Sequence, residues 1–370
     1  MLVSWCINLF NADGQDLTGK HWLEELILRN KEFKEPVIYK NDTFGRRVFF
    51  NRAQFQDVAN FSGANFDSLA YFSKARFFND VIFRGAQFNA GVDYLFVQFQ
   101  KVADFADAQF HSWADFWKVQ FNAEAYFSSA IFDNSAIFNI TQFNAAALFS
   151  YSQFNYRTSF PQAEFASQAD FTAAKFVSWV EFKNAVFDSS AIFMSAQFDS
   201  IVGFSKVQFN STANFSKAQF KASADFFGAQ FNAAAVFSAA HFSADAIFFT
   251  SCFNSLADFS NARFDAKIDF EETFLPDTLI FSNVRLNNEV DFSLAKTHNN
   301  SKCKIFLSGT DIEKIKLNYD LFELFFPDSI SSAQKTIIYE TLLRRFNTLR
   351  DMKSREKLAM EFRDFKEKMK

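Results

Sequence analysis

The sequence predicts an all-β solenoid, folded as a four-sided β-helix of about 22 residues per coil, with a small N-terminal cap and a C-terminal α-helical segment. Two observations carry this prediction. Phenylalanines recur at steps that alternate between five and six residues, and a small or β-branched residue stands two positions before nearly every one of them. The chain also has only 9 Gly and 4 Pro, which argues against a turn-punctuated sandwich and against a disordered chain.

The phenylalanines form two series with a period of eleven. The first runs from Phe50 to Phe292 and is interrupted only by Tyr94. The second runs from Phe55 to Phe264 and continues with Leu275 and Leu286. Because side chains two apart on an extended segment point the same way, each segment places a small residue and a Phe inward. An eleven-residue period also fits a right-handed helical supercoil, but the spacing of two and the recurrent Asn, Asp and Ser favour strands and turns.

The size of the rings sets the number of repeats per coil. A coil of eleven residues would have a perimeter of about 36 Å, at ~3.3 Å per residue, which is too thin to hold two Phe rings. Two repeats make a square coil with four inward Phe, so residue n should lie beneath residue n+22. The expected core ladders are therefore Phe61, Phe83, Phe105 and Phe127 in one column, and Phe66, Phe88, Phe110 and Phe132 in another.

Segments such as Ala169-Asp170-Phe171-Thr172-Ala173 and Ala257-Asp258-Phe259-Ser260-Asn261 resemble the pentapeptide-repeat family. The resemblance covers residues 44 to 294 and is closest to the Phe-centred branch, although every second unit here carries one extra residue. It implies a right-handed, four-sided β-helix whose core is filled by the central residue of each unit. It also implies a second function, DNA mimicry, because some members resemble duplex DNA in shape and charge and occupy the DNA-binding groove of type II topoisomerases.

An open stack of coils exposes strand edges, so caps are expected at both ends. We predict an N-terminal cap over residues 1–43, with an amphipathic helix from Thr18 to Asn30, and a β-helix over residues 44–296. Residues 297–370 should hold a last strand near 302–307 and a helical hairpin, because apolar residues recur there at helical spacing. A homodimer formed through a terminal segment is a further possibility.

No pattern of catalytic or ligand-binding residues is recognisable, so we predict no enzyme activity, no cofactor and no metal site. The four histidines are dispersed, and no Gly-rich phosphate loop or nucleophile elbow is present. The three cysteines lie far apart, no basic signal sequence begins the chain, and no apolar stretch is long enough for a membrane span. These features predict a cytoplasmic protein without a membrane span.

The positions between the Phe residues should carry any function. Regular Asp residues and Gln columns fit turns and solvated ladders. Apolar residues at outward positions indicate a partner surface, for which the candidates are Tyr126, Leu148, Trp113 and Trp117. A net charge of -4 makes direct nucleic-acid binding unexpected.

The preferred hypothesis is therefore a non-enzymatic scaffold that binds a protein partner, of unknown identity, through its flat faces. One alternative is a DNA mimic that binds a type II topoisomerase, although lysines such as Lys74, Lys101 and Lys118 interrupt the acidic stripes that mimicry needs. Another is a membrane-associated or regulatory repeat protein that uses the basic helical tail.

Overall fold

The computed structural model describes residues 18–298 and 301–368. The chain divides into two compact units, Met1–Ser200 (unit 1) and Ile201–Lys370 (unit 2), which are taken separately below.

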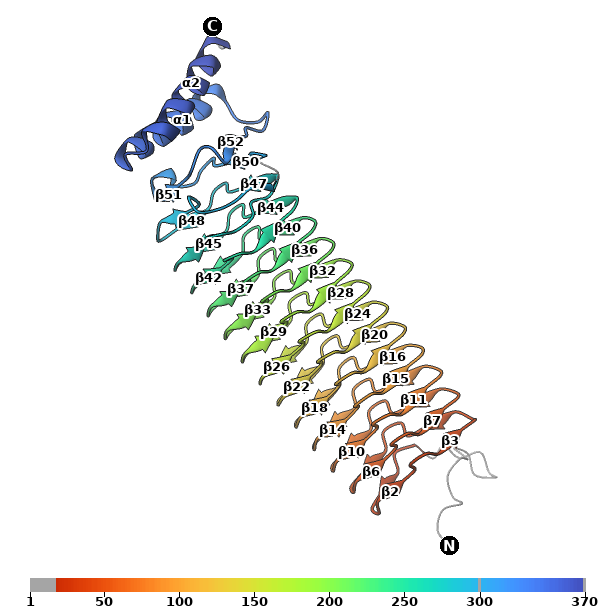
Figure 1. Ribbon diagram of the computed structural model, residues 1–370. Helices are drawn as coiled ribbons and strands as arrows, with labels where there is room; N and C mark the ends of the chain where they lie inside the picture. Colours follow the sequence, from red (N-terminus) through yellow and green to blue (C-terminus); the bar gives the residue numbers. More distant parts are fainter. Residues whose placement is uncertain (1–17, 299–300, 369–370) are drawn as a thin grey trace. The chain divides into compact units, whose positions relative to one another are not determined.

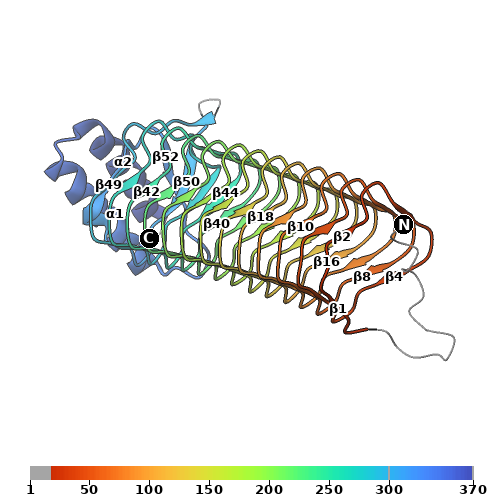
Figure 2. The same ribbon diagram turned by 90° about the horizontal axis from the view of Figure 1, so that it is seen from below.

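Unit 1 is a stack of four-sided turns (Figure 1). Each side of a turn is a two-residue strand, and each strand pairs in parallel with the strand 22 residues later, as Gln87 and Phe88 do with Gln109 and Phe110. Figure 2 shows the same turns from a second direction, with the chain completing one loop per turn. The four resulting sheets are called faces 1 to 4, in the order in which the chain visits them.

In each turn the chain passes through faces 1 and 2 first. Face 1 contains β1 (His21–Trp22), β5 (Thr43–Phe44), β9 (Asn65–Phe66), β13 (Gln87–Phe88), β17 (Gln109–Phe110), β21 (Ile131–Phe132), β25 (Gln153–Phe154), β29 (Lys175–Phe176) and β33 (Gln197–Phe198). Face 2 contains β2 (Leu26–Ile27), β6 (Val48–Phe49), β10 (Ala70–Tyr71), β14 (Val92–Asp93), β18 (Ala114–Asp115), β22 (Ala136–Ile137), β26 (Thr158–Ser159) and β30 (Val180–Glu181).

Faces 3 and 4 complete each turn. Face 3 contains β3 (Glu32–Phe33), β7 (Gln54–Phe55), β11 (Arg76–Phe77), β15 (Gln98–Phe99), β19 (Gln120–Phe121), β23 (Gln142–Phe143), β27 (Glu164–Phe165) and β31 (Val186–Phe187). Face 4 contains β4 (Val37–Ile38), β8 (Ala59–Asn60), β12 (Val81–Ile82), β16 (Ala103–Asp104), β20 (Ala125–Tyr126), β24 (Ala147–Leu148), β28 (Ala169–Asp170) and β32 (Ala191–Ile192).

Two kinds of corner account for the alternating steps of five and six residues. After the first Phe of a repeat the chain makes a tight turn, in which the Ala64 N–H donates to the Phe61 carbonyl at 3.0 Å and Gly63 has a φ of 64°. The Asn60 side chain supports this turn by accepting from the Ser62 N–H at 2.9 Å, which explains the recurrent Asp or Asn. After the second Phe the corner is one residue longer and has no such hydrogen bond, so the extra residue lies there.

The Phe residues stack in columns along the inside of unit 1. In the column Phe61, Phe83, Phe105 and Phe127, successive ring centroids are 4.8, 5.0 and 4.9 Å apart. In the column Phe66, Phe88, Phe110 and Phe132 they are 4.7, 4.9 and 4.6 Å apart. Rings of different columns meet edge to face, as Phe61 and Phe72 do at 87°. The predicted solenoid with a 22-residue register is thus confirmed.

Two hydroxyl groups inside this core differ in whether they form a hydrogen bond. Thr141 replaces the usual small residue and donates its hydroxyl to the Phe116 carbonyl at 2.7 Å. Tyr94 replaces a Phe and keeps the stack with Phe72 and Phe116, at 5.1 and 4.8 Å. Its hydroxyl is fully buried and has no partner among the described residues, so burial raises the pKa of Tyr94 well above the usual value.

The predicted amphipathic helix from Thr18 to Asn30 is wrong. This segment forms strands β1 and β2, and its N–H groups bond to the following turn, as in Leu26 to the Arg47 carbonyl at 3.1 Å. The apolar stripe expected of a helix is split, since Leu26 is buried while Leu23 is 76% exposed. Pairing with the next turn therefore overrides the local helical pattern. The repeat register begins before residue 44, and the division of the chain into three regions stays a prediction. The part of the cap before Thr18 lies outside the described residues.

Unit 2 continues the repeat pattern before its C-terminal segment. Its turns contain β34 (Val202–Gly203), β35 (Gln208–Phe209), β36 (Ala213–Asn214), β37 (Gln219–Phe220), β38 (Ala224–Asp225), β39 (Gln230–Phe231), β40 (Ala235–Val236), β41 (His241–Phe242), β42 (Ala246–Ile247), β43 (Cys252–Phe253), β44 (Leu256–Asp258), β45 (Arg263–Phe264), β46 (Ile268–Asp269), β47 (Thr278–Ile280), β48 (Arg285–Leu286) and β49 (Val290–Asp291). The strand expected near 302–307 is β50 (Cys303–Phe306), followed by η2 (Ile312–Lys314), β51 (Ile315–Lys316) and β52 (Phe322–Leu324).

Two helices end unit 2, α1 (Ser332–Thr348) and α2 (Met352–Lys368), and they lie side by side (Figure 1). They confirm the predicted helical segment, although β51 and β52 follow the expected last strand before the first helix begins at Ser332. The buried side chains of the two helices follow a helical spacing and include Ile338, Leu342, Phe346, Leu358 and Phe362. Among the described residues, no helix combines the length and apolar character that a bilayer span requires.

Candidate functional site

Face 2 of unit 1 differs from the other faces because tryptophan residues lie at both of its corners. Of the tryptophans in residues 18–298, Trp22 belongs to face 1, whereas Trp113, Trp117 and Trp179 occupy the corners on either side of face 2. Trp113 immediately precedes β18, and Trp117 follows it by two residues. We call face 2 and its two corners the tryptophan face.

Trp113 lies against the preceding turn. Its indole occupies the space where a Cβ atom on Gly91 would be, so only glycine leaves room for the ring in this position. The side chain of Trp113 is nevertheless 37% exposed, and Tyr156 at the same corner is 54% exposed. Trp179 is half-buried and carries the Arg157 guanidinium over its ring at 4.3 Å. This corner therefore presents aromatic surface to solvent.

The opposite corner of the tryptophan face holds Phe96 and Trp117, which meet edge to face with their centroids 4.8 Å apart. The Lys118 ammonium lies 4.5 Å from the Trp117 ring and 5.8 Å from the Phe96 ring. Phe96 is 39% exposed. Its φ of 59° is a backbone conformation that bulky residues rarely adopt.

Between the two corners, Asp93 and Asp115 occupy adjacent positions of the strand ladder. Each carboxylate accepts a hydrogen bond from the backbone N–H two residues later, from Leu95 at 2.8 Å and from Trp117 at 2.9 Å. Burial raises the pKa of both groups, and the charge of Asp115 adds to the effect on Asp93. These hydrogen bonds are those of the structural turn described above, so the pair carries no catalytic assignment.

The structure separates the four residues that sequence analysis proposed as a partner surface. Trp113 and Trp117 border face 2, whereas Tyr126 and Leu148 are register partners on face 4. Faces 2 and 4 are separated by a complete face in either direction around the turn, so the four residues do not form one patch. The predicted partner surface thus falls into two separate sites. One, beside face 2, contains Trp113 and Trp117, and the other, on face 4, contains Tyr126 and Leu148.

Sequence analysis missed the other members of the tryptophan face. Trp179 lies three coils after Trp113 in the 22-residue register, with Arg157 between them. The register was therefore enough to find this column. Phe96 gave no such signal, because a Phe outside the two regular series cannot be placed on a corner from spacing alone.

Face 3 provides a contrast, since its outward amides bond to one another. The Gln98 amide donates to Gln120 at 2.9 Å, Gln120 donates to Gln142 at 3.0 Å, and Gln142 donates to Glu164 at 3.1 Å. A neighbouring column continues the pattern, with Asn144 donating to Asn122 at 2.7 Å. These side chains satisfy each other's hydrogen-bonding groups along the stack, as the Gln columns predicted.

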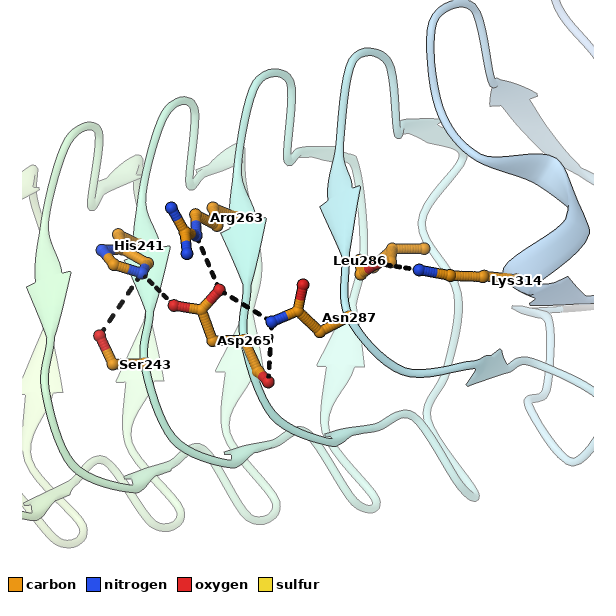
Figure 3. A network of polar contacts seen from close by, with 7 residues as sticks. All are labelled: His241, Ser243, Arg263, Asp265, Leu286, Asn287 and Lys314. Atoms are coloured by element: carbon orange, nitrogen blue, oxygen red, sulfur yellow. Dashed lines mark hydrogen bonds and ion pairs between the residues drawn. The ribbon is translucent and has the colours of Figure 1, made fainter.

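Unit 2 contains a polar network that superficially resembles a catalytic triad (Figure 3). His241 Nε2 lies 2.7 Å from Asp265 and 3.4 Å from the Ser243 hydroxyl. Both partners thus contact the same ring nitrogen, whereas a proton relay needs the acid and the nucleophile on different nitrogens. Hydrogen bonds from Arg263 and then His241 lower the pKa of Asp265, and Asn287 also donates to it at 3.2 Å. The arrangement is a surface ladder of side chains.

Cys252 and His298 form a second pair in unit 2, with Sγ and Nε2 3.8 Å apart. The same Nε2 lies 3.2 Å from the Phe253 carbonyl, and the Cys252 thiol donates to Asn254 at 3.2 Å. Burial raises the pKa of Cys252, which opposes formation of the thiolate. Across the part of the chain that the structure describes, no three His, Cys, Asp or Glu side chains are placed to hold a metal ion.

The fold places the chain in the class of β-solenoid proteins. A family model described as pentapeptide repeats, in nine copies, matches residues 50–93 and 182–230. These matches confirm that the chain contains pentapeptide repeats, as the resemblance indicated. No curated protein and no solved structure matches the chain. Solenoids of this family are typically non-catalytic scaffolds.

Proposed function

We propose that this pentapeptide-repeat protein is a non-enzymatic scaffold that binds a protein partner through the tryptophan face of unit 1. The observation that carries the proposal is the concentration of Trp113, Trp117 and Trp179 along the two edges of one face. Tryptophan and tyrosine are enriched at the centres of protein interfaces, where they contribute most of the binding free energy.

The contrast with face 3 supports this assignment. There the outward polar groups already hydrogen-bond to one another, so a partner would gain little by replacing these bonds. On the tryptophan face, exposed rings at Trp113, Phe96 and Tyr156 leave apolar surface that a partner can cover. Cations at Lys118 and Arg157 lie over two of the rings and give the surface polar contacts as well.

The alternatives receive less support. A DNA mimic needs continuous acidic stripes, but corner residues beside this face include Arg29, Arg52 and Lys74. No observation favours membrane association of the helical hairpin.

Site-specific photocrosslinking tests the proposal. A photoreactive residue replaces Ile137 on the tryptophan face, or Gln98 on face 3 as the matched control, in the cells that make this protein. The partner that crosslinks from position 137 is then purified, and its affinity for wild-type and variant chains is measured by calorimetry. We expect crosslinks from position 137 only, and we expect Trp117→Ala to weaken binding by ~2 kcal/mol, or about 30-fold.

Two results would contradict the proposal. One is a partner that crosslinks equally from positions 98 and 137. The other is a partner whose affinity is unchanged in the double variant Trp113→Ala/Trp117→Ala, provided that this variant unfolds at the same urea concentration as the wild-type chain.

A further inference from the structure

The corner between faces 2 and 3, at one edge of the tryptophan face, contains a groove with a volume of about 230 Å³ in its first three described turns. Three successive turns line it, and each contributes one cation and one uncharged polar residue. The lining residues are Arg29, Asn30, Asn51, Arg52, Ser73 and Lys74. None of them is acidic, so the groove is cationic throughout.

The 22-residue register holds these residues in two adjacent columns, with Arg29, Asn51 and Ser73 in one and Asn30, Arg52 and Lys74 in the next. The Asn30 N–H donates to the Asn51 carbonyl at 2.9 Å, and the Arg52 N–H donates to the Ser73 carbonyl at 2.9 Å. Successive turns are therefore about 4.8 Å apart, and the backbone positions of the three cationic residues span about 10 Å. The Asn51 amide also donates to the Ser73 hydroxyl at 2.8 Å, which orders the uncharged side chains between the cations.

The three cations lack anionic partners. Within the described residues, neither Arg29, Arg52 nor Lys74 forms an ion pair. Arg29 lies over the Phe49 ring at 4.1 Å and Lys74 over the Phe96 ring at 5.6 Å, contacts that orient the side chains without neutralising them. Asp93, the nearby carboxylate that bonds to Ser73, is also held by the Leu95 N–H. An anion bound between these three like charges would offset their mutual repulsion.

The turn itself does not require cations. Arg52 and Lys74 occupy its left-handed position, with φ values of 57° and 60°. Other turns at the same corner place Ile140 and Gln162 there, with nearly the same φ. The run of cations also stops abruptly, because Leu95 and Phe96 hold the corresponding positions of the next turn. The charge is thus a local property of these turns, and its length matches a short ligand better than a long polymer.

We propose that this groove binds a linear oligophosphate of about three phosphates, either as an inorganic chain or as the triphosphate group of a nucleotide. Arginine and lysine are the side chains that bind phosphate oxygens by charge-assisted hydrogen bonds. Three successive turns each present one cation, an arrangement that favours a chain of phosphates over a single phosphate. The assignment is independent of the protein partner proposed above.

Calorimetry on the full chain, with EDTA present and ionic strength held constant, tests this assignment. The probes are tripolyphosphate, orthophosphate and ATP, and the variant is Arg52→Gln/Lys74→Gln. The matched control is Lys217→Gln, because Lys217 has the same left-handed turn position in unit 2, with a φ of 59°. We expect tripolyphosphate to bind at least tenfold more tightly than orthophosphate, and the double variant to lose at least tenfold in affinity while the control is unchanged.

The two sources are separated by the ATP titration. Equal binding of ATP and tripolyphosphate indicates that only the phosphates are recognised, whereas tighter binding of ATP identifies a nucleotide as the ligand, and both support the groove. Absence of saturable tripolyphosphate binding, equal binding of orthophosphate, or an unchanged affinity in the double variant would overturn the assignment. Both substituted side chains are exposed, so a wild-type circular dichroism spectrum and urea midpoint should show that the variant is folded.

Discussion

The repeated turns of unit 1 and the helical hairpin of unit 2 are stabilised by different interactions. Between successive turns, backbone hydrogen bonds and ring stacks repeat with the same geometry, as in the Phe83, Phe105 and Phe127 stack. The hairpin combines its apolar packing with polar contacts that occur only once. Tyr319 and Tyr339 both donate to Glu361, at 2.6 and 2.8 Å.

Further polar contacts attach the hairpin to the strands of unit 2. Arg345, only 8% exposed, donates to the Ile315 carbonyl at 3.0 Å and also contacts Glu289. Lys353 and Lys357 contact Asp320. The comparison shows that a repeat can add turns without a new solution for each one, whereas the end of the stack needs residues found only there.

The largest effect should come from the core of the repeat. Phe105→Ala removes a fully buried ring between two stacked neighbours, and we expect a loss of about 3–5 kcal/mol in the free energy of unfolding, measured with urea. Tyr94→Phe in the same core is the control, because it keeps the ring and removes only an unpaired hydroxyl. It should be neutral or stabilising. A loss below about 1 kcal/mol for Phe105→Ala would show that the stack carries little of the stability.

A smaller effect should come from the attachment of the hairpin. Arg345→Ala leaves the Ile315 carbonyl without its donor, and we expect a loss of about 2 kcal/mol that is confined to the C-terminal segment. Hydrogen exchange should accelerate in α1 and α2 and stay unchanged in the turns of unit 1. Arg344→Ala, which alters an exposed neighbour, should have little effect. Faster exchange throughout unit 1 would contradict the contrast drawn between the two regions.

The smallest effect should come from the exposed contacts of Asp320. Hydrogen bonds from Lys353 and then Lys357 lower the pKa of Asp320 from 3.8 to about 2. A group with a lowered pKa stabilises the fold above its unfolded pKa, so this contribution is present above about pH 4 and is lost as the pH falls through 2. Asp320→Asn should remove this part of the pH dependence of helix content, followed by circular dichroism, and cost less than Arg345→Ala. An identical acid titration in the variant would exclude the contact.

Individual residues show why the sequence predicted the fold more completely than it predicted which surface residues lie together. Each Phe in the two series has to lie inside, because its area and its regular spacing allow no other placement, and the register follows from that requirement. A corner residue has no such constraint. Trp113 packs over Gly91, one turn earlier, and this contact follows from the three-dimensional course of the corner and not from residue spacing.

The sequence by itself determined the solenoid, the 22-residue register, the Phe columns and the existence of two C-terminal helices. Only the tertiary structure decided that Trp113 and Trp117 share a face which excludes Tyr126 and Leu148. It also decided that Leu26 and Ile27 form a strand, and that Arg29, Arg52 and Lys74 meet in one groove. The physical reason is that burial acts on every repeat in the same way and is therefore visible as a period. Surface contacts depend on how each corner turns its side chains toward one face or the other.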